Sequence, residues 1–487
     1  MKKFTKGIIT FVFALMVLAP FSVFAATEIT NADLETAKGG TPTKGITYDN
    51  EFDWYSVAEG EYIFGEDINI GTSTLGVEDA TVVFDLNGKT LTCESDEYGA
   101  IEVFKNANVT IKGNGTITSP IPVFGYDESI VSIENGTFNG EVRSHGHEDS
   151  QGIHYSYFNI KNGTFKAALH FEYANVVIDN GTFDTTEANQ DAVYVNSGAS
   201  IEINGGTFKS VSNGLMVEPG GYYDSQLGEF VSGANPKSVV INAGTFTGVE
   251  ESGIGAFSVD SLEINGGTFT GGMVGLWFND VDKITLAGGT YKATSNDAMG
   301  AITTNGEDTS ALTAILGDGC SYDPAMDATV IEKWDMKYAV SQKEITVVNP
   351  NAKENTTEIT VIEGADQTFT VGESDAAVFR FSADYSLFEN GGKVYVDDAL
   401  VDSANYTSES GSTIIKLAKE FMATLTNGTH TIKVEFNNGQ VATANFVVKG
   451  STVTNPATGD NALIYFGILA LSLVSLVITK SYMNKLN

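Results

Sequence analysis

The chain of 487 residues has few cysteines and few prolines. Its two cysteines, Cys93 and Cys320, lie at opposite ends of a repetitive region. Stacked coils there would separate them by more than the ~7 Å between Cα atoms that a disulfide spans. We therefore predict two buried, inert thiols without a disulfide framework. Only 9 prolines accompany 52 glycines, which excludes a collagen-like chain and favours a turn-rich all-β protein over a disordered one.

Cationic side chains are also scarce. Lys and Arg together number 27 against 62 Asp and Glu, which gives a formal net charge of -35. So acidic a surface repels phosphate backbones, and nucleic acid is a poor partner for it. The charge suits a soluble protein outside the cell. It also has the simpler interpretation of keeping a long repeat protein from aggregating.

The region from Val109 to Tyr291 repeats one short phrase. Its copies are VTIKGNGTI ending at Ile117, VSIENGTF at Phe138, FNIKNGTF at Phe165, VVIDNGTF at Phe183, IEINGGTF at Phe208, VVINAGTF at Phe246, LEINGGTF at Phe269 and ITLAGGTY at Tyr291. Self-similarity of this kind is typical of a solenoid, in which each repeat buries its apolar side only against its neighbours.

Each repeat encodes three short strands. Ile201 to Ile203 alternate apolar and polar residues, and Asn204 to Gly206 then supply a turn. A second strand begins at Thr207, and a third covers Leu215 to Val217. Three strands and three turns make one coil of a parallel β-helix, and coils stack at roughly 4.8 Å. The irregular spacing of the repeats, without a leucine frame, argues against a leucine-rich repeat.

The start of the chain has the order of a secretory signal peptide. Lys2, Lys3 and Lys6 precede an apolar core and the small-residue site around Ala25. A retained first helix is the alternative, which the short core disfavours. The predicted segments are a signal peptide at 1–26, a flexible leader at 27–50, a capped β-helix at 51–348, a linker at 349–357, a separate module at 358–449, a linker at 450–454 and a C-terminal signal at 455–487.

The C-terminal signal combines a pentapeptide, an apolar run at 462–479 and a basic tail. The pentapeptide is Asn455, Pro456, Ala457, Thr458 and Gly459. This order resembles the LPXTG-type sorting signal of Gram-positive surface proteins. The resemblance implies that a sortase cleaves the Thr458–Gly459 bond and joins Thr458 to peptidoglycan, with 462–479 as a transmembrane segment. Asn455 stands where the family usually has Leu, so the sortase class stays open. A plain membrane anchor is the alternative.

The module at 358–449 contains the phrases VIEGADQTFTVGE and NGTHTIKVEFNNGQ. They resemble an immunoglobulin-like module of Gram-positive surface and cellulolytic proteins, some of which are filed as carbohydrate-binding. The resemblance implies a small β-sandwich that acts mainly as a spacer or stalk, and no catalytic residue transfers with it. Within the module we predict one helical stretch, Ile415–Leu425, and final strands at Thr431–Phe436 and Val441–Val448.

The third strands of successive repeats align into a row of outward-facing residues. The predicted row is Glu102, Pro122, Arg143, His170, Tyr194, Met216, Gly255 and Trp277. Large, partly apolar groups on an exposed face predict a glycan that stacks on Tyr194, Met216 and Trp277, with polar contacts from His170 and Arg143. Packing within the row, or cover by a loop, is the alternative. An insertion at 219–237 carries Tyr222 and Tyr223 and is predicted to form a lip over Met216.

A second insertion, Ser144 to Tyr157, holds three of the chain's five histidines. They are His145, His147 and His154, with Glu148 and Asp149 between them. Imidazole and carboxylate together suit zinc or another borderline metal, so we weigh a divalent metal site against a solvated polar loop. The glycan-binding interpretation itself requires no cofactor.

The repeats resemble the pectate-lyase-like β-helix superfamily in fold, which does not fix a function. A lyase of that class would imply Arg143 as the base. A hydrolase would need two carboxylates ~5–9.5 Å apart, for which Glu148, Asp149 and Glu172 are candidates. No motif of either chemistry is present. The favoured interpretation is a wall-attached surface protein that binds a host or dietary glycan. A glycan-degrading enzyme and a passive spacer are the alternatives.

Overall fold

The computed structural model describes residues 26–149, 152–224, 229–350, 359–383, 385–389, 391–409, 413–437 and 440–450. These separate into two compact units, divided between residues 357 and 358. The predicted signal peptide and the predicted sorting signal at 455–487 lie outside the described ranges. Within those ranges, no helix has both the length and the apolar character needed to cross a membrane.

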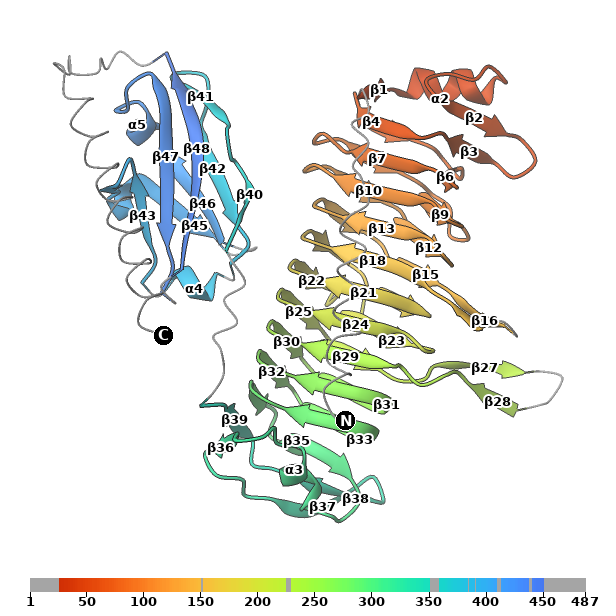
Figure 1. Cartoon of the computed structure of the whole chain (residues 1–487), viewed down its shortest axis with the longest axis vertical. Helices are drawn as coiled ribbons and strands as arrows, with labels where there is room; N and C mark the ends of the chain where they lie inside the picture. Colours follow the sequence, from red (N-terminus) through yellow and green to blue (C-terminus); the bar gives the residue numbers. More distant parts are fainter. Residues whose placement is uncertain are drawn as a thin grey trace, which may run out of the picture. The chain divides into compact units, whose positions relative to one another are not determined.

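The first unit is a β-solenoid of about ten turns, which confirms the predicted parallel β-helix (Figure 1). Its strands form three parallel ladders, here numbered in the order in which each repeat contributes to them. The first ladder contains β1 (Thr27–Ile29), β4 (Gly60–Phe64), β7 (Thr81–Asp85), β10 (Asn108–Lys112), β13 (Ile130–Ile133), β18 (Ser156–Ile160), β21 (Ala174–Ile178), β24 (Ser200–Ile203), β29 (Ser238–Ile241) and the second halves of β31 (Ser252–Ile264) and β33 (Val274–Leu286).

The second ladder carries the phenylalanine of each repeat. It contains β5 (Ile68–Asn69), β8 (Thr90–Thr92), β11 (Thr116–Thr118), β14 (Thr137–Asn139), β19 (Thr164–Phe165), β22 (Thr182–Asp184), β25 (Thr207–Ser210), β30 (Thr245–Gly248), β32 (Thr268–Gly271) and β34 (Thr290–Ala293). The third ladder contains β3 (Trp54–Val57), β6 (Thr74–Glu78), β9 (Ile101–Phe104), β12 (Val123–Tyr126), β15 (Val142–His145), β20 (Leu169–Glu172), β23 (Val193–Asn196), β26 (Leu215–Val217), the first halves of β31 and β33, and β35 (Gly300–Asn305).

A column of stacked aromatic rings fills the interior behind the second ladder. It comprises Phe138, Phe165, Phe183, Phe208, Phe246, Phe269 and Tyr291, all fully buried. Neighbouring centroids lie 4.5–5.2 Å apart with interplanar angles of 4–20°. Because each ring covers the next, one coil's apolar side becomes dry only when both neighbours are in place.

The turn before each stacked ring requires glycine. Gly181 has φ +142°, and a Cβ atom there would lie 2.9 Å from the Phe183 ring and 3.2 Å from the Gly163 carbonyl oxygen. The same carbonyl accepts a hydrogen bond from the Thr182 N–H at 2.8 Å, which ties one coil to the next. Asparagine side chains add a second tie beside these turns, since the Asn242 amide donates to the Asn204 side-chain oxygen at 2.8 Å.

Residues 27–50 form an ordered cap, so the prediction of a flexible leader there is wrong. The cap comprises β1, α2 (Asn31–Lys38) and β2 (Ile46–Asp49), which pairs antiparallel with β3. Its apolar side chains are buried against the first coil, among them Ile29, Leu34 and Ile46. The spacing of these apolar residues does not match the repeat, so no pattern in the sequence predicted a cap here. Together they cover the edge of the first coil, which would otherwise be exposed.

Antiparallel strands close the other end of the solenoid. β38 (Met336–Val340) pairs with β35 and with β37 (Thr329–Lys333), which extends the third ladder. β39 (Glu344–Val348) pairs with β34 and with β36 (Ser321–Asp323), which extends the second. A short helix, α3 (Ala311–Ala314), lies between them in the chain. Both cysteines are unpaired, as predicted, with Cys93 buried and Cys320 partly buried, and burial raises the pKa of each thiol.

The second unit consists of two sheets around its own apolar core. One sheet runs β40 (Val361–Glu363), β42 (Ala376–Phe381), β46 (Thr413–Ala418) and β45 (Tyr406–Glu409). The other runs β41 (Thr368–Thr370), β48 (Val441–Lys449), β47 (Gly428–Glu435), β43 (Lys393–Val396) and β44 (Ala399–Leu400). Phe379 and Phe446 meet between the sheets with centroids 5.5 Å apart. The resemblance to an immunoglobulin-like module stays a prediction.

The predicted helix at Ile415–Leu425 is wrong over its first part. Thr413 to Ala418 form β46, in which alternate residues are buried and the whole strand pairs with β42. Only Lys419–Met422 are helical, as α5. Among its described residues the unit also has the short helix α4 (Ser386–Glu389) and the 3-10 turn η1 (Ser403–Asn405). Pairing with a neighbouring strand therefore overrides the local helix preference of this segment.

Phe208→Ala tests the aromatic column. We expect it to lower the free energy of unfolding by about 3–5 kcal/mol, because Phe208 lies between two rings at 4.5 Å and leaves a cavity when truncated. All three tryptophans belong to the first unit, so tryptophan fluorescence in a urea titration of residues 26–450 reports on the solenoid. Phe52→Ala is the control, since Phe52 is 67% exposed. Equal loss in both variants would contradict the account.

Candidate functional site on the outer surface of the third ladder

The predicted row of outward-facing residues exists, with one correction. Strand register gives the order Ser56, Gly76, Glu102, Phe124, Arg143, His170, Tyr194, Met216, Gly255, Trp277 and Thr303, here called the outer row. Phe124 stands where Pro122 was predicted, because β12 begins only at Val123. A row of this length extends over roughly 40–50 Å at one coil per ~4.8 Å.

Arg143 and His170 converge on one carboxylate in the middle of the outer row. The Arg143 guanidinium donates to Glu141 Oε2 at 2.8 Å, and His170 Nδ1 lies 3.4 Å from Glu141 Oε1. Burial acts to raise the pKa of Glu141, but hydrogen bonds from His170 and Arg143 outweigh it and lower that pKa to about 2. The guanidinium of Arg143 is engaged in an ion pair with Glu141, so this geometry does not favour Arg143 as a base.

Tyr194 and Met216 occupy the next positions of the row and contact their neighbours. The Tyr194 ring lies 4.9 Å from the His170 ring at 58°, and its hydroxyl donates to Glu218 at 2.9 Å. Burial and this hydrogen bond raise the pKa of Tyr194. Met216 leans over Gly255, where an added Cβ would lie 3.0 Å from the Met216 sulfur. Much of the surface of Tyr194 and Met216 is therefore in contact with neighbouring residues and is not available to a ligand.

Trp277 is packed against the C-terminal cap. Its ring lies 6.4 Å from Trp334 at 15° and 5.8 Å from Tyr338 at 79°, and its Nε1 donates to Asn305 Oδ1 at 3.1 Å. Of these three aromatic residues, Trp334 is the most exposed, at 59%. It lies at the tip of the β37–β38 hairpin and has φ +53°. A bulky residue in this left-handed region is unusual and marks Trp334 as a functional candidate, which the repeat pattern did not indicate.

The insertion with Tyr222 and Tyr223 folds into a hairpin that projects from the third ladder (Figure 1). It consists of β27 (Gly221–Asp224) and β28 (Glu229–Ser232), in which Tyr222 pairs with Val231 and Tyr223 with Phe230. The hairpin follows β26, the strand that carries Met216. A lip over Met216 stays a prediction.

The histidine insertion also forms a hairpin, β16 (His147–Asp149) and β17 (Gly152–His154). It brings His147 and His154 together. His145 is instead directed to the neighbouring coil, where its Nδ1 lies 3.1 Å from Glu172 Oε2 and this contact raises the pKa of the imidazole. The structure therefore divides the three histidines that the sequence grouped.

The three carboxylates predicted as candidates for catalysis are also divided between two elements, β16 and β20. Glu148 is exposed on the hairpin, and Asp149 pairs with Gly152 through the backbone. Glu172 lies on β20, where the hydrogen bond from His145 lowers its pKa. These positions supply no observation that favours the enzyme interpretation.

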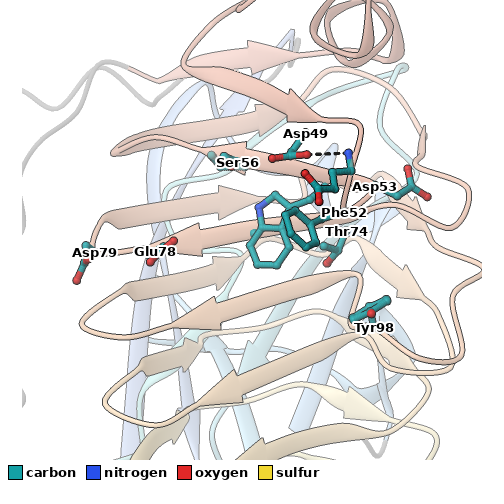
Figure 2. Close-up of a pocket in the computed structure, with 12 residues that line it drawn as sticks. Asp49, Phe52, Asp53, Ser56, Thr74, Glu78, Asp79 and Tyr98 are labelled. Carbon is teal, nitrogen blue, oxygen red and sulfur yellow. Dashed lines mark hydrogen bonds between the residues drawn. The ribbon is translucent and has the colours of Figure 1, made fainter. Parts of the chain in front are cut away.

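A cavity of about 800 Å³ lies at the N-terminal end of the third ladder (Figure 2). Its lining comes from the end of β2, the β2–β3 turn, β3, β6 with the residue after it, and the loop before β9. It comprises Asp49, Glu51, Phe52, Asp53, Trp54, Ser56, Val57, Thr74, Gly76, Glu78, Asp79 and Tyr98. We call it the N-terminal cavity. Phe52 is 67% exposed and Tyr98 is 45% exposed. The N-terminal cavity is therefore bordered by large apolar faces that do not pack against other residues.

Asp53 fixes the turn that presents Phe52. It has φ +54°, and its carboxylate accepts hydrogen bonds from the hydroxyls of Ser73, Tyr48 and Thr72. The hydrogen bonds from Ser73 and Tyr48 are the main reasons that its pKa is lowered to about 2. Trp54 follows directly and lies over Gly76, where even a Cβ atom would fall 1.9 Å from the indole. Glycine at position 76 is therefore required for this wall of the cavity.

A stack of aromatic side chains continues from the cavity along the third ladder. Trp54 lies 4.9 Å from Phe104, Phe104 lies 4.4 Å from Tyr126, and Tyr126 lies 4.3 Å from Phe124. Trp54, Phe104 and Tyr126 come from different coils, whereas Phe124 and Tyr126 lie on the same strand, β12. The faces left for a ligand are those of Phe52 and Tyr98 and the open side of Trp54.

The N-terminal cavity is acidic. Five of its twelve lining residues carry carboxylates, and the lining includes no Lys or Arg. Lys38 lies 3.8 Å from Asp53, and Lys105 pairs with Glu78, so part of this charge is balanced from outside the lining. Carboxylate oxygens accept hydrogen bonds from hydroxyl or ammonium groups, whereas an anionic ligand would be repelled.

No repeat or motif in the sequence predicted this cavity. Its residues precede the recognisable repeats, and they meet only because the β2–β3 hairpin packs beside β6. The cluster Glu51, Phe52, Asp53, Trp54 was a usable signal, because acidic and aromatic residues alternate in it.

Comparison of the chain with protein-family models, with curated proteins and with solved structures gives no match. The resemblances noted in the repeats, in the second unit and at the C-terminus therefore receive no support from these comparisons. The outer surface of the third ladder is the firmest basis for inferring a function.

Glu102 provides a test of how the outer row is covered. It is 1% exposed and accepts hydrogen bonds from the Gly99 N–H at 2.9 Å and the Tyr126 hydroxyl at 3.3 Å. Burial outweighs these bonds and raises the pKa of Glu102 to about 7, against ~4.3 for an unfolded chain. Between these two values the folded state binds more protons, so this carboxyl lowers stability as pH rises.

Glu102→Gln should therefore reduce the loss of unfolding free energy between pH 4.5 and 7.5 by on the order of 2 kcal/mol. Urea titrations of residues 26–450, followed by tryptophan fluorescence at both pH values, measure this difference. Glu250→Gln, at an exposed position, is the control. The same pH dependence in wild type and Glu102→Gln would show that Glu102 is ionised and solvated in the folded protein.

Proposed function

We propose that this chain is a secreted, wall-attached surface protein of a Gram-positive bacterium whose solenoid binds a neutral glycan. The ligand-binding site is the N-terminal cavity, and the outer row extends the surface along which a longer glycan lies. The observation that carries the proposal is the pairing of exposed aromatic faces with carboxylates around one cavity.

This combination suits sugar rings. The apolar C–H face of a pyranose stacks on aromatic rings such as Phe52 and Tyr98, while its hydroxyls donate to carboxylates such as Asp49 and Glu78. A volume of about 800 Å³ is within the usual range for ligand sites. Sites of this kind, on loops held by a rigid scaffold, are a common place for binding function.

Charge restricts the class of glycan. A formal net charge of -35 together with five lining carboxylates disfavours uronate and sulfated polymers. Neutral sugars meet no such penalty. Tyr194, Met216 and Trp277, the residues predicted from sequence, then serve as a secondary surface, because packing within the row and against the cap uses much of their area.

Glycan-array binding of residues 26–450 tests this site. We expect neutral glycans to bind and uronates not to bind, and Phe52→Ala with Tyr98→Ala to weaken binding at least tenfold, because both rings are exposed and their loss leaves the core intact. Val249→Ala, at another exposed apolar residue, is the matched control.

Unchanged binding in the Phe52 and Tyr98 variants would reject the N-terminal cavity. Loss of binding in Tyr194→Ala with Trp277→Ala instead would move the site to the middle and far end of the outer row. A chain that binds no glycan on the array would favour the passive spacer.

Wall attachment rests on the sequence at 455–487. A pentapeptide, an apolar run and a basic tail in this order support covalent anchoring through Thr458. In a Gram-positive host with its sortases, we expect the chain to be released from cell walls by a muramidase. Thr458→Ala should shift it to the membrane fraction or the medium, because the bond to be cleaved is altered. Equal wall-bound fractions for both chains would reject sortase anchoring.

A further inference from the structure

The β16–β17 hairpin places two imidazole rings face to face. His147 and His154 are register partners, and their rings stack with centroids 4.5 Å apart at 6°. The turn between β12 and β13 brings two carboxylates to the same place. His147 Nδ1 lies 3.4 Å from Asp127 Oδ2, and His154 Nδ1 lies 3.3 Å from Glu128 Oε1.

One ligand atom from each of Asp127, His147 and His154 lies within 4.8 Å of the other two. A tetrahedral zinc ion with bonds of ~2.0–2.1 Å separates its donors by about 3.3 Å. The two rings must tilt from their parallel stack to reach that spacing. Both side chains are partly exposed, His147 at 45% and His154 at 26%.

We propose that Asp127, His147 and His154 form a site for a borderline divalent metal ion, with zinc as the best fit. Two imidazoles and one carboxylate match the donors that zinc takes, whereas calcium and magnesium prefer an all-oxygen set. Glu128 supplies a further oxygen beside His154. His145 lies outside the site, because it contacts Glu172 on β20.

The metal joins two segments that follow successive strands of the third ladder, β12 and β15. Asp127 and Glu128 belong to one coil, and the histidines belong to the hairpin inserted after the next strand of the third ladder. The Glu128 N–H already donates to the Tyr155 carbonyl at 2.9 Å, so the two segments are in register before the metal binds. Metal binding therefore fixes the base of a hairpin on the outer surface of the third ladder.

Titration calorimetry with zinc chloride tests the site. Residues 26–450 contain both compact units with their separate cores, and they are titrated at pH 7.4 in a non-chelating buffer. We expect one zinc ion per chain, at least tenfold weaker binding in His147→Ala and in His154→Ala, and binding within twofold of wild type in His145→Ala.

A melting experiment distinguishes lost binding from lost folding. Without metal, we expect His147→Ala to have the same melting temperature as wild type. Zinc should raise the melting temperature of wild type and of His145→Ala, and it should leave the melting temperature of His147→Ala unchanged. Zinc binding that survives both His147→Ala and His154→Ala overturns the proposal. So does the absence of zinc binding to wild type, or equal loss in His145→Ala. Calcium chloride in place of zinc should give no binding that depends on His147.

Discussion

Stacking from coil to coil is the interaction on which the first unit depends. A single coil of three short strands has no dry interior, and its apolar residues become buried only beneath the coils on either side. The column from Phe138 to Tyr291 shows this most directly, because each ring's partner belongs to another repeat. The glycine turns follow from the same constraint. A side chain at Gly181 would enter the space that the Phe183 ring and the Gly163 carbonyl occupy.

The same geometry gives the outer surface its character. Because the register is fixed in all three ladders, residues that point outward also form rows, and neighbours in a row contact one another. This is why Tyr126 stacks on Phe104, and why Tyr194 meets His170. Aromatic residues on the outside of a solenoid are therefore not in themselves a binding surface. The ends differ, because the row stops there and the turns of the caps leave Phe52 and Trp334 exposed.

The repeats allowed the fold of the first unit to be predicted from the sequence. The alternation at Ile201 to Ile203, the Asn-Gly turns and the recurring Phe specified strands, turns and interior, and local rules were enough because each contact repeats in the next coil. Where repetition is weaker, prediction failed. β12 was placed two residues early, the cap at 27–50 was taken as flexible, and a strand at Thr413–Ala418 was taken as helix. Each of these depends on a partner distant in sequence.

The candidate sites illustrate the same limit. The grouping of His145, His147 and His154 was visible in the sequence, but Asp127 and the separation of His145 required the hairpin register. The N-terminal cavity includes both the β2–β3 turn and Tyr98, and the local cluster at 51–54 could not predict that these two parts of the chain meet.

The central claim is that a ligand binds the outer surface of the third ladder at its N-terminal end. Hydrogen exchange of residues 26–450, with and without a saturating neutral oligosaccharide, measures this directly. The account predicts slower exchange in residues 49–57 and 74–79 and around Tyr98, which line the N-terminal cavity, and little change in the second unit. Protection confined to the second unit or to the other two ladders would contradict it.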